Sequence, residues 1–267
     1  MAHFFHSTTG TKVAFRRTFR DHEFMSLRSV ERQWTFLAER DPYWAILTAP
    51  EKAGNRWDVD EFFSTGIAEI DGVMRYIEGT YPSLARRNAL DFGCGAGRLT
   101  QALARHFDHV IGIDISAPMI ELAGRHNRAG ERCEYLVNSR PDLALLPTAS
   151  LDFIYSNITL QHMSPCWSRG YLREMMRLLA PGGALLFQLP SRVRGNLADR
   201  ARRQAELAYS HLCSLIRLPH RYLEMHAQSR SRVVRFLEGA GGSVLDVTEN
   251  ENAGPKWESL SYLVVKR

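Results

Sequence analysis

The chain has 267 residues, of which 45% are hydrophobic and 24% are charged, as expected of a globular protein with a sizeable core. This length accommodates one large α/β domain with an appendage, or two small domains. No apolar run approaches the roughly 18 to 20 residues that a transmembrane helix needs, so we expect no membrane partner. The formal net charge of +5 is too small to identify an anionic partner by itself.

The amino-terminal stretch is basic and contains no acidic residue before Asp21. It lacks the continuous apolar segment and small-residue cleavage site of a secretory signal peptide. Organelle import is compatible with this composition, but an arm over residues 1–25 is the simpler interpretation. None of the cysteines forms a C-x-x-C pair, so we expect no metal site, no disulfide framework and a cytoplasmic location; they are Cys94, Cys133, Cys166 and Cys213.

Two segments before residue 85 carry apolar residues at helical spacing. The first contains Leu27, Val30, Trp34 and Leu37, and Pro42 ends it. The second is closed by Gly79, and its apolar positions are Phe63, Ile67, Ile70, Met74 and Ile77. We therefore predict a helical cap over residues 26–84. It either packs on the core or forms a lid over a substrate pocket, and both can hold.

From residue 85 to 267 short apolar strands alternate with helices, which is typical of a mostly parallel sheet covered on both faces. The predicted strands are 89–92, 109–114, 133–137, 151–156, 184–190, 243–250 and 259–266. Residues 191–225 interrupt this rhythm with an amphipathic helical pattern. A simple crossover would need only a short connection there, so we interpret this segment as an insertion between the fifth and sixth strands.

A glycine-rich loop follows the first strand, in the stretch Asp91-Phe92-Gly93-Cys94-Gly95-Ala96-Gly97. Glycines let a backbone approach a ligand closely, and the helix that follows contributes partial positive charge. A dinucleotide fingerprint, G-x-G-x-x-G/A, would require a small residue at position 98. That position holds Arg98, so the third glycine comes one residue early.

The acidic residue before the loop distinguishes between ligands. A pyrophosphate repels a carboxylate, whereas the ammonium and sulfonium groups of S-adenosylmethionine attract Asp91. Asp114 ends the second strand, where a carboxylate can accept hydrogen bonds from two ribose hydroxyls. A tight turn without a ligand is the plain structural alternative for these glycines.

The motif D-x-G-x-G-x-G, Asp114, the Pro-Gly-Gly before the fifth strand and the paired last strands resemble the class I S-adenosylmethionine-dependent methyltransferases. The resemblance covers residues 85 to 190 and, more weakly, 229 to 267. It implies a doubly wound, Rossmann-like α/β fold with a seven-stranded sheet of order 3-2-1-4-5-7-6, in which strand 7 is antiparallel. It also implies S-adenosyl-L-methionine as the cofactor.

The resemblance further implies which residues surround the cofactor. Asp91 would lie near its amino acid part, Asp114 would bind the ribose, and the glycine loop would border it; the loop positions are Gly93, Cys94, Gly95 and Gly97. Ile115 and Met119 would flank the adenine. The family often has an acid after strand three, where this chain has Asn138 and Ser139, so a neutral side chain would have to serve. Ser156 and Asn157 would lie near the methionine part.

Methyl transfer from a sulfonium is an in-line displacement, and a hydroxyl acceptor usually also needs a base. His162 follows strand four at the carboxyl edge of the sheet, where it could act as that base or orient the acceptor. His226 could face the pocket from the other side. A histidine that only bonds the backbone of a structural loop is an equally open interpretation for His162.

The segment 192–235 contains ten arginines, which could track a phosphate backbone or simply form the solvated face of a helix. Aromatic residues are sparse there, so no platform for stacked bases is evident. The loop after strand four also lacks the prolines typical of methyltransferases that act on base amino groups. We therefore expect a methyltransferase that acts on O or N of a small molecule rather than on nucleic acid. An RNA or protein methyltransferase, a non-catalytic S-adenosylmethionine-binding protein and, more distantly, an NAD oxidoreductase are the alternatives.

Overall fold

The computed structural model describes residues 18–195, 205 and 224–267. Most of the predicted arm (1–25) and most of the predicted insertion (191–225) lie outside the described residues. Residues 191–193, which we assigned to the insertion, belong instead to the end of a long strand. None of the helices in the described ranges is long and apolar enough to cross a membrane.

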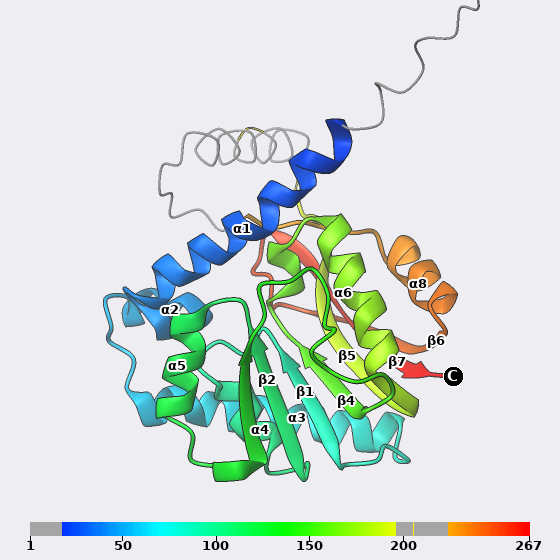
Figure 1. The fold of residues 1–267 in the computed structure, drawn as a ribbon, viewed down its shortest axis with the longest axis horizontal. Helices are drawn as coiled ribbons and strands as arrows, with labels where there is room; N and C mark the ends of the chain where they lie inside the picture. Colours follow the sequence, from blue (N-terminus) through cyan, green and yellow to red (C-terminus); the bar gives the residue numbers. More distant parts are fainter. Residues whose placement is uncertain (1–17, 196–204, 206–223) are drawn as a thin grey trace, which may run out of the picture.

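A seven-stranded sheet forms the centre of the molecule (Figure 1), in the order β3-β2-β1-β4-β5-β7-β6. The pairs among β1 to β5 are parallel, and β7 is antiparallel to both β5 and β6. This arrangement confirms the predicted fold class and strand order. The strands are β1 (Asn88–Phe92), β2 (His109–Asp114), β3 (Cys133–Val137), β4 (Leu151–Ser156), β5 (Leu179–Val193), β6 (Gly242–Asn250) and β7 (Trp257–Lys266).

The bounds of β2, β3 and β4 coincide with the predicted ones, whereas β5 is longer than predicted. Leu179 already pairs with Leu151, and regular pairing resumes where Ala184 faces Phe153. The Pro-Gly-Gly segment therefore lies inside β5 as an irregular stretch, because Gly182 has a φ of 75° that interrupts the ladder.

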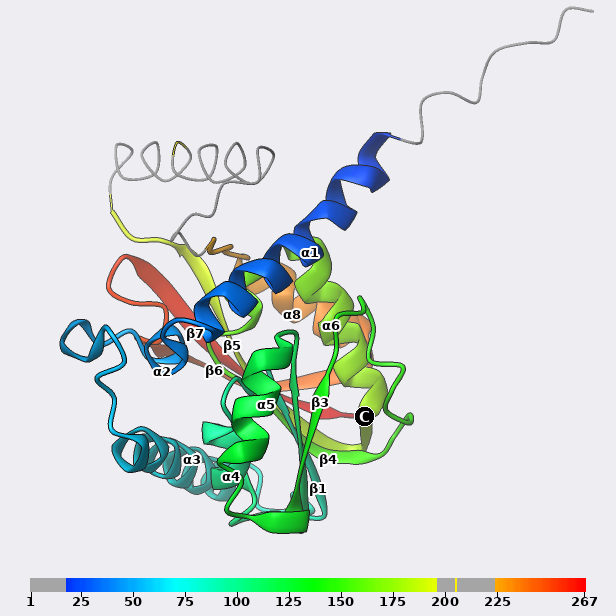
Figure 2. The same cartoon turned by 60° about the vertical axis from the view of Figure 1, so that its left-hand side comes forward.

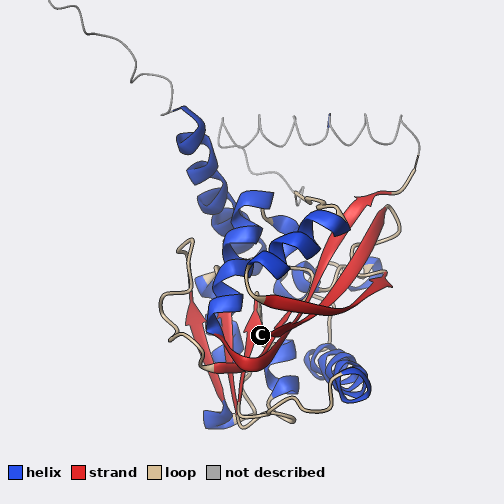
Figure 3. Ribbon diagram, turned by 90° about the vertical axis from the view of Figure 1, so that its right-hand side faces the viewer, coloured by secondary structure: helices blue, strands red, loops and turns tan. Residues whose placement is uncertain are grey.

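Helices cover both faces of the sheet (Figure 3). Along β1, Ala89 packs in the core on the side of α3 and α4, while Leu90 packs on the side of α6 and α8. This alternation follows from the two-residue period of a strand and requires apolar residues on both faces. The helices on these two faces are α3 (Val59–Thr80), α4 (Arg98–Leu103), α5 (Ala117–Arg125), α6 (Pro165–Leu178) and α8 (Arg230–Gly239).

Helix α3 is the second predicted cap helix, and the side chain of Asp58 caps it by accepting from the backbone N–H of Glu61 at 2.9 Å. Its predicted apolar stripe is buried with one exception, because Ile67 is 38% exposed. The buried face is centred on Phe62, Gly66 and Ile70, which leaves Ile67 at its rim.

The first cap helix, α1 (Thr18–Ala38), crosses the carboxyl edge of the sheet, and the short helix α2 (Pro42–Ile46) follows it. Figure 2 shows both above that edge, while α3 and α4 lie lower. Pro42 opens α2 at its first turn, where a missing N–H costs nothing. The two helices thereby come to lie where a parallel α/β sheet binds its ligands.

Glycines on α3 allow a test of how tightly the cap packs. A Cβ at Gly66 would lie 2.6 Å from the carbonyl oxygen of Arg98, whereas a Cβ at Gly72 would have no neighbour closer than 3.9 Å. We expect Gly66→Ala to lower the free energy of unfolding by about 1–3 kcal/mol through overpacking. Gly72→Ala, in the same helix, should raise it by about 0.4–1 kcal/mol. Urea denaturation of both variants would check this, and equal effects would contradict the packing.

Candidate functional site

A cavity at the carboxyl edge of the sheet contains about 910 Å³ of space that no protein atom fills. Part of this space is open to solvent. Residues from α1, α2, the glycine loop and the ends of β2, β3 and β4 line it. The cap contributes Val30, Trp34 and Ile46 to its wall.

The glycine loop forms one side of this cavity with Gly93, Cys94 and Gly95. Gly93 and Gly95 have φ angles of 81° and 51°, in the left-handed region that favours glycine. A Cβ at Gly93 would lie 2.2 Å from the Thr159 side chain, and one at Gly95 would lie 2.6 Å from Ile46. The loop therefore needs glycine both for its conformation and for the close approach of its neighbours.

Gly97 stands behind the cavity rather than in its wall, as the residue that caps α4. Its φ is 81°, and a Cβ there would meet the Tyr135 hydroxyl at 2.6 Å. The cysteine of the loop, Cys94, is buried, and burial raises the pKa of its thiol. It therefore contributes packing rather than a reactive thiolate.

Asp114 connects the end of β2 to the glycine loop and lines the cavity. One carboxylate oxygen accepts from the backbone N–H of Gly95 at 2.9 Å, and the other accepts from that of Ser116 at 2.9 Å. Burial raises its pKa, and these backbone donors oppose that shift. Each oxygen has a second lone pair, so the carboxylate can also accept from two ligand hydroxyls.

Asp91 does not line the cavity. Its side chain is 1% exposed, lies behind the glycine loop and accepts from the Thr100 hydroxyl at 2.7 Å. Burial raises its pKa to about 7, although Thr100 and Arg98 lower it. The structure therefore places the acid of the motif outside the cavity wall, where it ties the end of β1 to α4.

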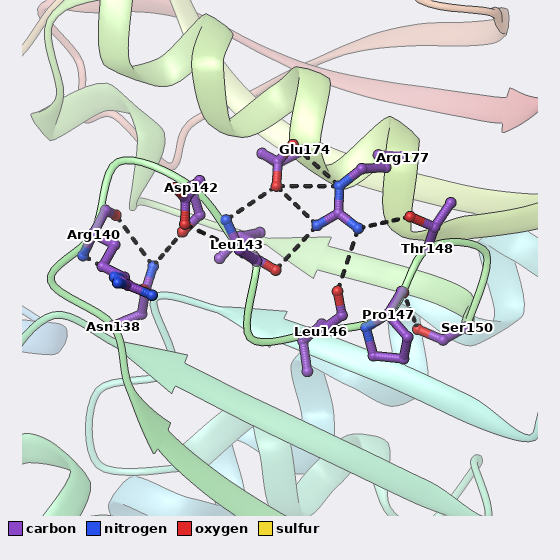
Figure 4. A network of polar contacts seen from close by, with 11 residues as sticks. Asn138, Arg140, Asp142, Leu143, Leu146, Pro147, Thr148, Ser150, Glu174 and Arg177 are labelled. Carbon is purple, nitrogen blue, oxygen red and sulfur yellow. Dashed lines mark hydrogen bonds and ion pairs between the residues drawn. The ribbon is translucent and has the colours of Figure 1, made fainter.

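The loop after β3 is held by its own side chains and by α6 (Figure 4). Asn138 lines the cavity, but its amide donates to the carbonyls of Arg140 and Asp142 at 3.3 and 2.9 Å. Glu174 accepts from the backbone N–H of Leu143, and Arg177 donates to the carbonyl of Leu143. The NH₂ of Asn138 is therefore engaged by its own loop.

Of the other residues predicted to surround the adenine, some line the cavity and one lies on the protein surface. Ile115 and Met119 line the cavity, and Met119 is 1% exposed. Ser139 is exposed and lies outside the wall. The adenine end of the predicted site thus has two apolar side chains, Ile115 and Met119, and the polar side chain of Asn138 also lines the cavity.

At the end of β4, Asn157 lines the cavity and Ser156 does not. The Ser156 hydroxyl donates to the carbonyl of Phe92 at 3.0 Å, which ties β4 to β1. The Asn157 amide donates to Glu69 at 2.7 Å, and its oxygen accepts from Asn252 at 2.9 Å. Asn157 is therefore held from α3 on one side and from the β6–β7 loop on the other.

Sequence reasoning missed Glu69, which organises the polar groups beside the cavity. It accepts from Arg98 at 2.8 Å, from the Tyr155 hydroxyl at 3.0 Å and from Asn157. Arg98 is 3% exposed and lines the cavity. The signal in the sequence was Arg98 itself, a charged residue at a position where a dinucleotide loop would have a small one.

The two predicted catalytic histidines lie in different surroundings. His162 is in the short helix η3 (Leu160–His162), lines the cavity and contacts the Trp34 ring edge-on at 5.4 Å between centroids. His226 lies outside the cavity wall, 3.5 Å from the carboxylate of Glu224. The structure thus brings only His162 to the cavity that Asp114 and Asn157 line.

In the described part of the chain, no group of three or more histidine, cysteine, aspartate or glutamate side chains is arranged to bind a metal ion.

Comparisons with known proteins match this architecture. Residues 89–183 match the family described as the methyltransferase domain. The chain is 33% identical over 110 residues to a ubiquinone biosynthesis O-methyltransferase of Xanthomonas oryzae pv. oryzae, which covers 41% of this chain and 45% of that protein. It is 31% identical over 140 residues to a trans-aconitate 2-methyltransferase of Deinococcus radiodurans, over 51% and 50% of the two chains. The chain thus spans about half the length of these relatives.

Among solved structures, magnesium protoporphyrin IX methyltransferase from Synechocystis PCC 6803 with bound SAH superposes with a TM-score of 0.63. The match covers 91% of this chain and all of that one at 15% identity, which supports the fold alone.

The raised pKa of Asp91 predicts a pH dependence of stability. Between the ordinary aspartate pKa and about 7, the folded protein holds a proton that the unfolded chain has released. The unfolded state then binds fewer protons, so stability falls as the pH rises through this window. Asn is neutral in both states, so Asp91→Asn should remove this loss, which amounts to at most about 1.4 kcal/mol per pH unit. Urea denaturation of both proteins across this window would check it, and a constant difference between them would contradict it.

Proposed function

We propose that this chain, which belongs to the class I S-adenosylmethionine-dependent methyltransferases, transfers a methyl group to an oxygen or nitrogen of a small acceptor. One observation carries the proposal: a single capped cavity is lined by both Asp114 and His162. Asp114 is suited to ribose hydroxyls, and His162 is suited to an acceptor that must lose a proton.

The residues of the cavity fit the cofactor that the family uses. The glycine loop leaves no room for side chains, Asp114 retains acceptor capacity, and Met119 and Ile115 provide an apolar slot. When bound, S-adenosylmethionine supplies a methyl group on a sulfonium, which is open to in-line attack. Of the chain's own residues, Trp34 and Ile46 add apolar surface to the wall, which favours the exclusion of water around a bound ligand.

A small acceptor is favoured over a polymer because the cap covers the cavity. Val30 and Trp34 of α1 form part of the cavity wall. Two of the arginines that could have formed a basic stripe are paired, Arg192 with Glu258 and Arg194 with Glu249. Arg200, Arg202, Arg203, Arg217 and Arg221 lie outside the described residues.

Oxygen is the first acceptor atom to test, because the relative from Xanthomonas oryzae pv. oryzae is an O-methyltransferase. The protein would be incubated with methyl-labelled S-adenosylmethionine and small phenols, alcohols and amines, beside total RNA and a protein mixture. We expect label in a small-molecule fraction. Label in RNA or protein alone would favour those alternatives, and tight cofactor binding without any transfer would favour a non-catalytic binding protein.

The ribose role of Asp114 has its own test. Asp114→Asn should weaken the binding of S-adenosylhomocysteine by more than roughly tenfold, because hydrogen bonds to a charged group contribute about 1.5–3 kcal/mol each. Asp108→Asn makes the same change before the opposite end of β2, at an exposed position, and serves as the control. Isothermal titration of both variants would measure the affinities. Unchanged affinity in Asp114→Asn would refute the assignment.

A further inference from the structure

Buried side chains form a continuous chain of hydrogen bonds from β7 to the cavity. The amide NH₂ of Gln188 donates to the Ser259 hydroxyl at 2.7 Å and to the side-chain oxygen of Gln161 at 3.1 Å. The amide nitrogen of Gln161 lies 3.2 Å from Nε2 of His162. Gln161, Gln188 and Ser259 are each at most 2% exposed. We call these three residues, together with His162, the glutamine relay.

Two backbone groups fix the direction of every bond in the relay. At one end the backbone N–H of Ile158 donates to Gln188 at 3.2 Å, so the oxygen of that amide faces Ile158. The NH₂ of Gln188 then faces Gln161, whose oxygen must accept, and the NH₂ of Gln161 is left to face His162. Each amide can satisfy its partners in only this orientation.

At the other end, Nδ1 of His162 lies 2.8 Å from the backbone carbonyl of Glu224. A carbonyl only accepts, so Nδ1 carries the proton. Gln161 presents a donor to Nε2, so Nε2 is the unprotonated nitrogen. Both ends of the relay therefore require the same state of the ring, a neutral imidazole with its proton on Nδ1.

Gln188 also holds a strained turn in the cavity wall. Ile158 has a φ of 59°, a left-handed conformation that is rare for a β-branched residue, and it lines the cavity. Such a conformation persists only where the surrounding structure imposes it. The bond from its N–H to Gln188 is one such constraint, so Gln188 supports two parts of the wall, Ile158 and His162.

We propose that Gln188 is a positioning residue that acts through Gln161 to hold His162 with Nε2 as a hydrogen-bond acceptor. Gln188 thereby selects which class of molecule can receive the methyl group. The proposal rests on the proposed function, in which the methyl acceptor meets His162.

A hydroxyl or amine of the methyl acceptor can replace the Gln161 donor at Nε2. It passes its proton to Nε2 as its oxygen or nitrogen forms the new bond to the methyl carbon and the carbon–sulfur bond breaks. A carboxylate near neutral pH has no proton to donate, and its oxygens would face the lone pair of Nε2 of His162. The substrate class is therefore a protic acceptor, a hydroxyl or an amine.

The test uses the full chain without cofactor or acceptor. Long-range ¹H–¹⁵N spectra of histidine-labelled protein at about neutral pH report which ring nitrogen carries the proton, and His162→Gln identifies the signal. In the wild type we expect the Nδ1–H form. In Gln188→Glu one carboxylate oxygen faces Gln161 as an acceptor, which turns that amide and points its oxygen at Nε2. The Nδ1–H neutral form should then be lost.

Gln228→Glu is the matched control, because Gln228 is another buried glutamine but bonds Ser168 instead of the relay. It should retain the wild-type pattern, which separates the effect of the relay from that of an added buried charge. If Gln188→Glu does not fold, Gln188→Met removes the amide without adding charge. Freed from Gln188, the Gln161 amide should turn, and the Nε2 resonance of His162 should shift.

An Nε2–H or doubly protonated ring in the wild type would overturn the proposal, and so would an unchanged pattern in the folded Gln188 variants. Methyl transfer to carboxylates as fast as to phenols would also overturn it. These spectra need no turnover, so they judge the relay independently. Failure of the protein to bind S-adenosylhomocysteine would instead remove the proposed function and leave the spectroscopic result standing.

Discussion

The carboxylate of Glu69 connects α3 to α4, to β4 and to the residue that follows β4. It accepts hydrogen bonds from Arg98 at the start of α4, from Tyr155 on β4 and from Asn157 beyond β4. A charge this close to the core is tolerated because donors surround it, and removing one partner would leave an unpaired polar group. The cap helix α3 is thereby connected to both the glycine loop and the far wall of the cavity.

The cavity wall combines polar groups that can bind a ligand, such as Asp114, with apolar side chains from α1 and α2. Asp114 holds the glycine loop through Gly95 and still has lone pairs to offer. Ile46 of α2 lies against the same glycine, so the cover and the loop constrain each other. Where a bound ligand displaces water from this site, electrostatic interactions are strengthened, and the geometry of the reacting groups matters more than any single contact.

The sheet could be predicted from the sequence because its strands are short apolar runs between helical patterns, and β2, β3 and β4 appear with the predicted bounds. The glycine loop and Asp114 were predictable for the same reason, since local spacing specifies them. Glu69 and Gln188 were not, because their partners lie far away in the chain: Glu69 meets Asn157, and Gln188 meets Ser259. The position of Asp91 behind the loop also depends on packing, which spacing does not reveal.

The central claim is that the cavity binds S-adenosylmethionine. Isothermal titration of the protein with S-adenosylmethionine and S-adenosylhomocysteine, beside NAD as the comparison ligand, tests it most directly. We predict binding of both adenosyl ligands and none of NAD, because the loop has Arg98 where a dinucleotide fingerprint needs a small residue. Binding of NAD alone, or of none of the three, would contradict the account.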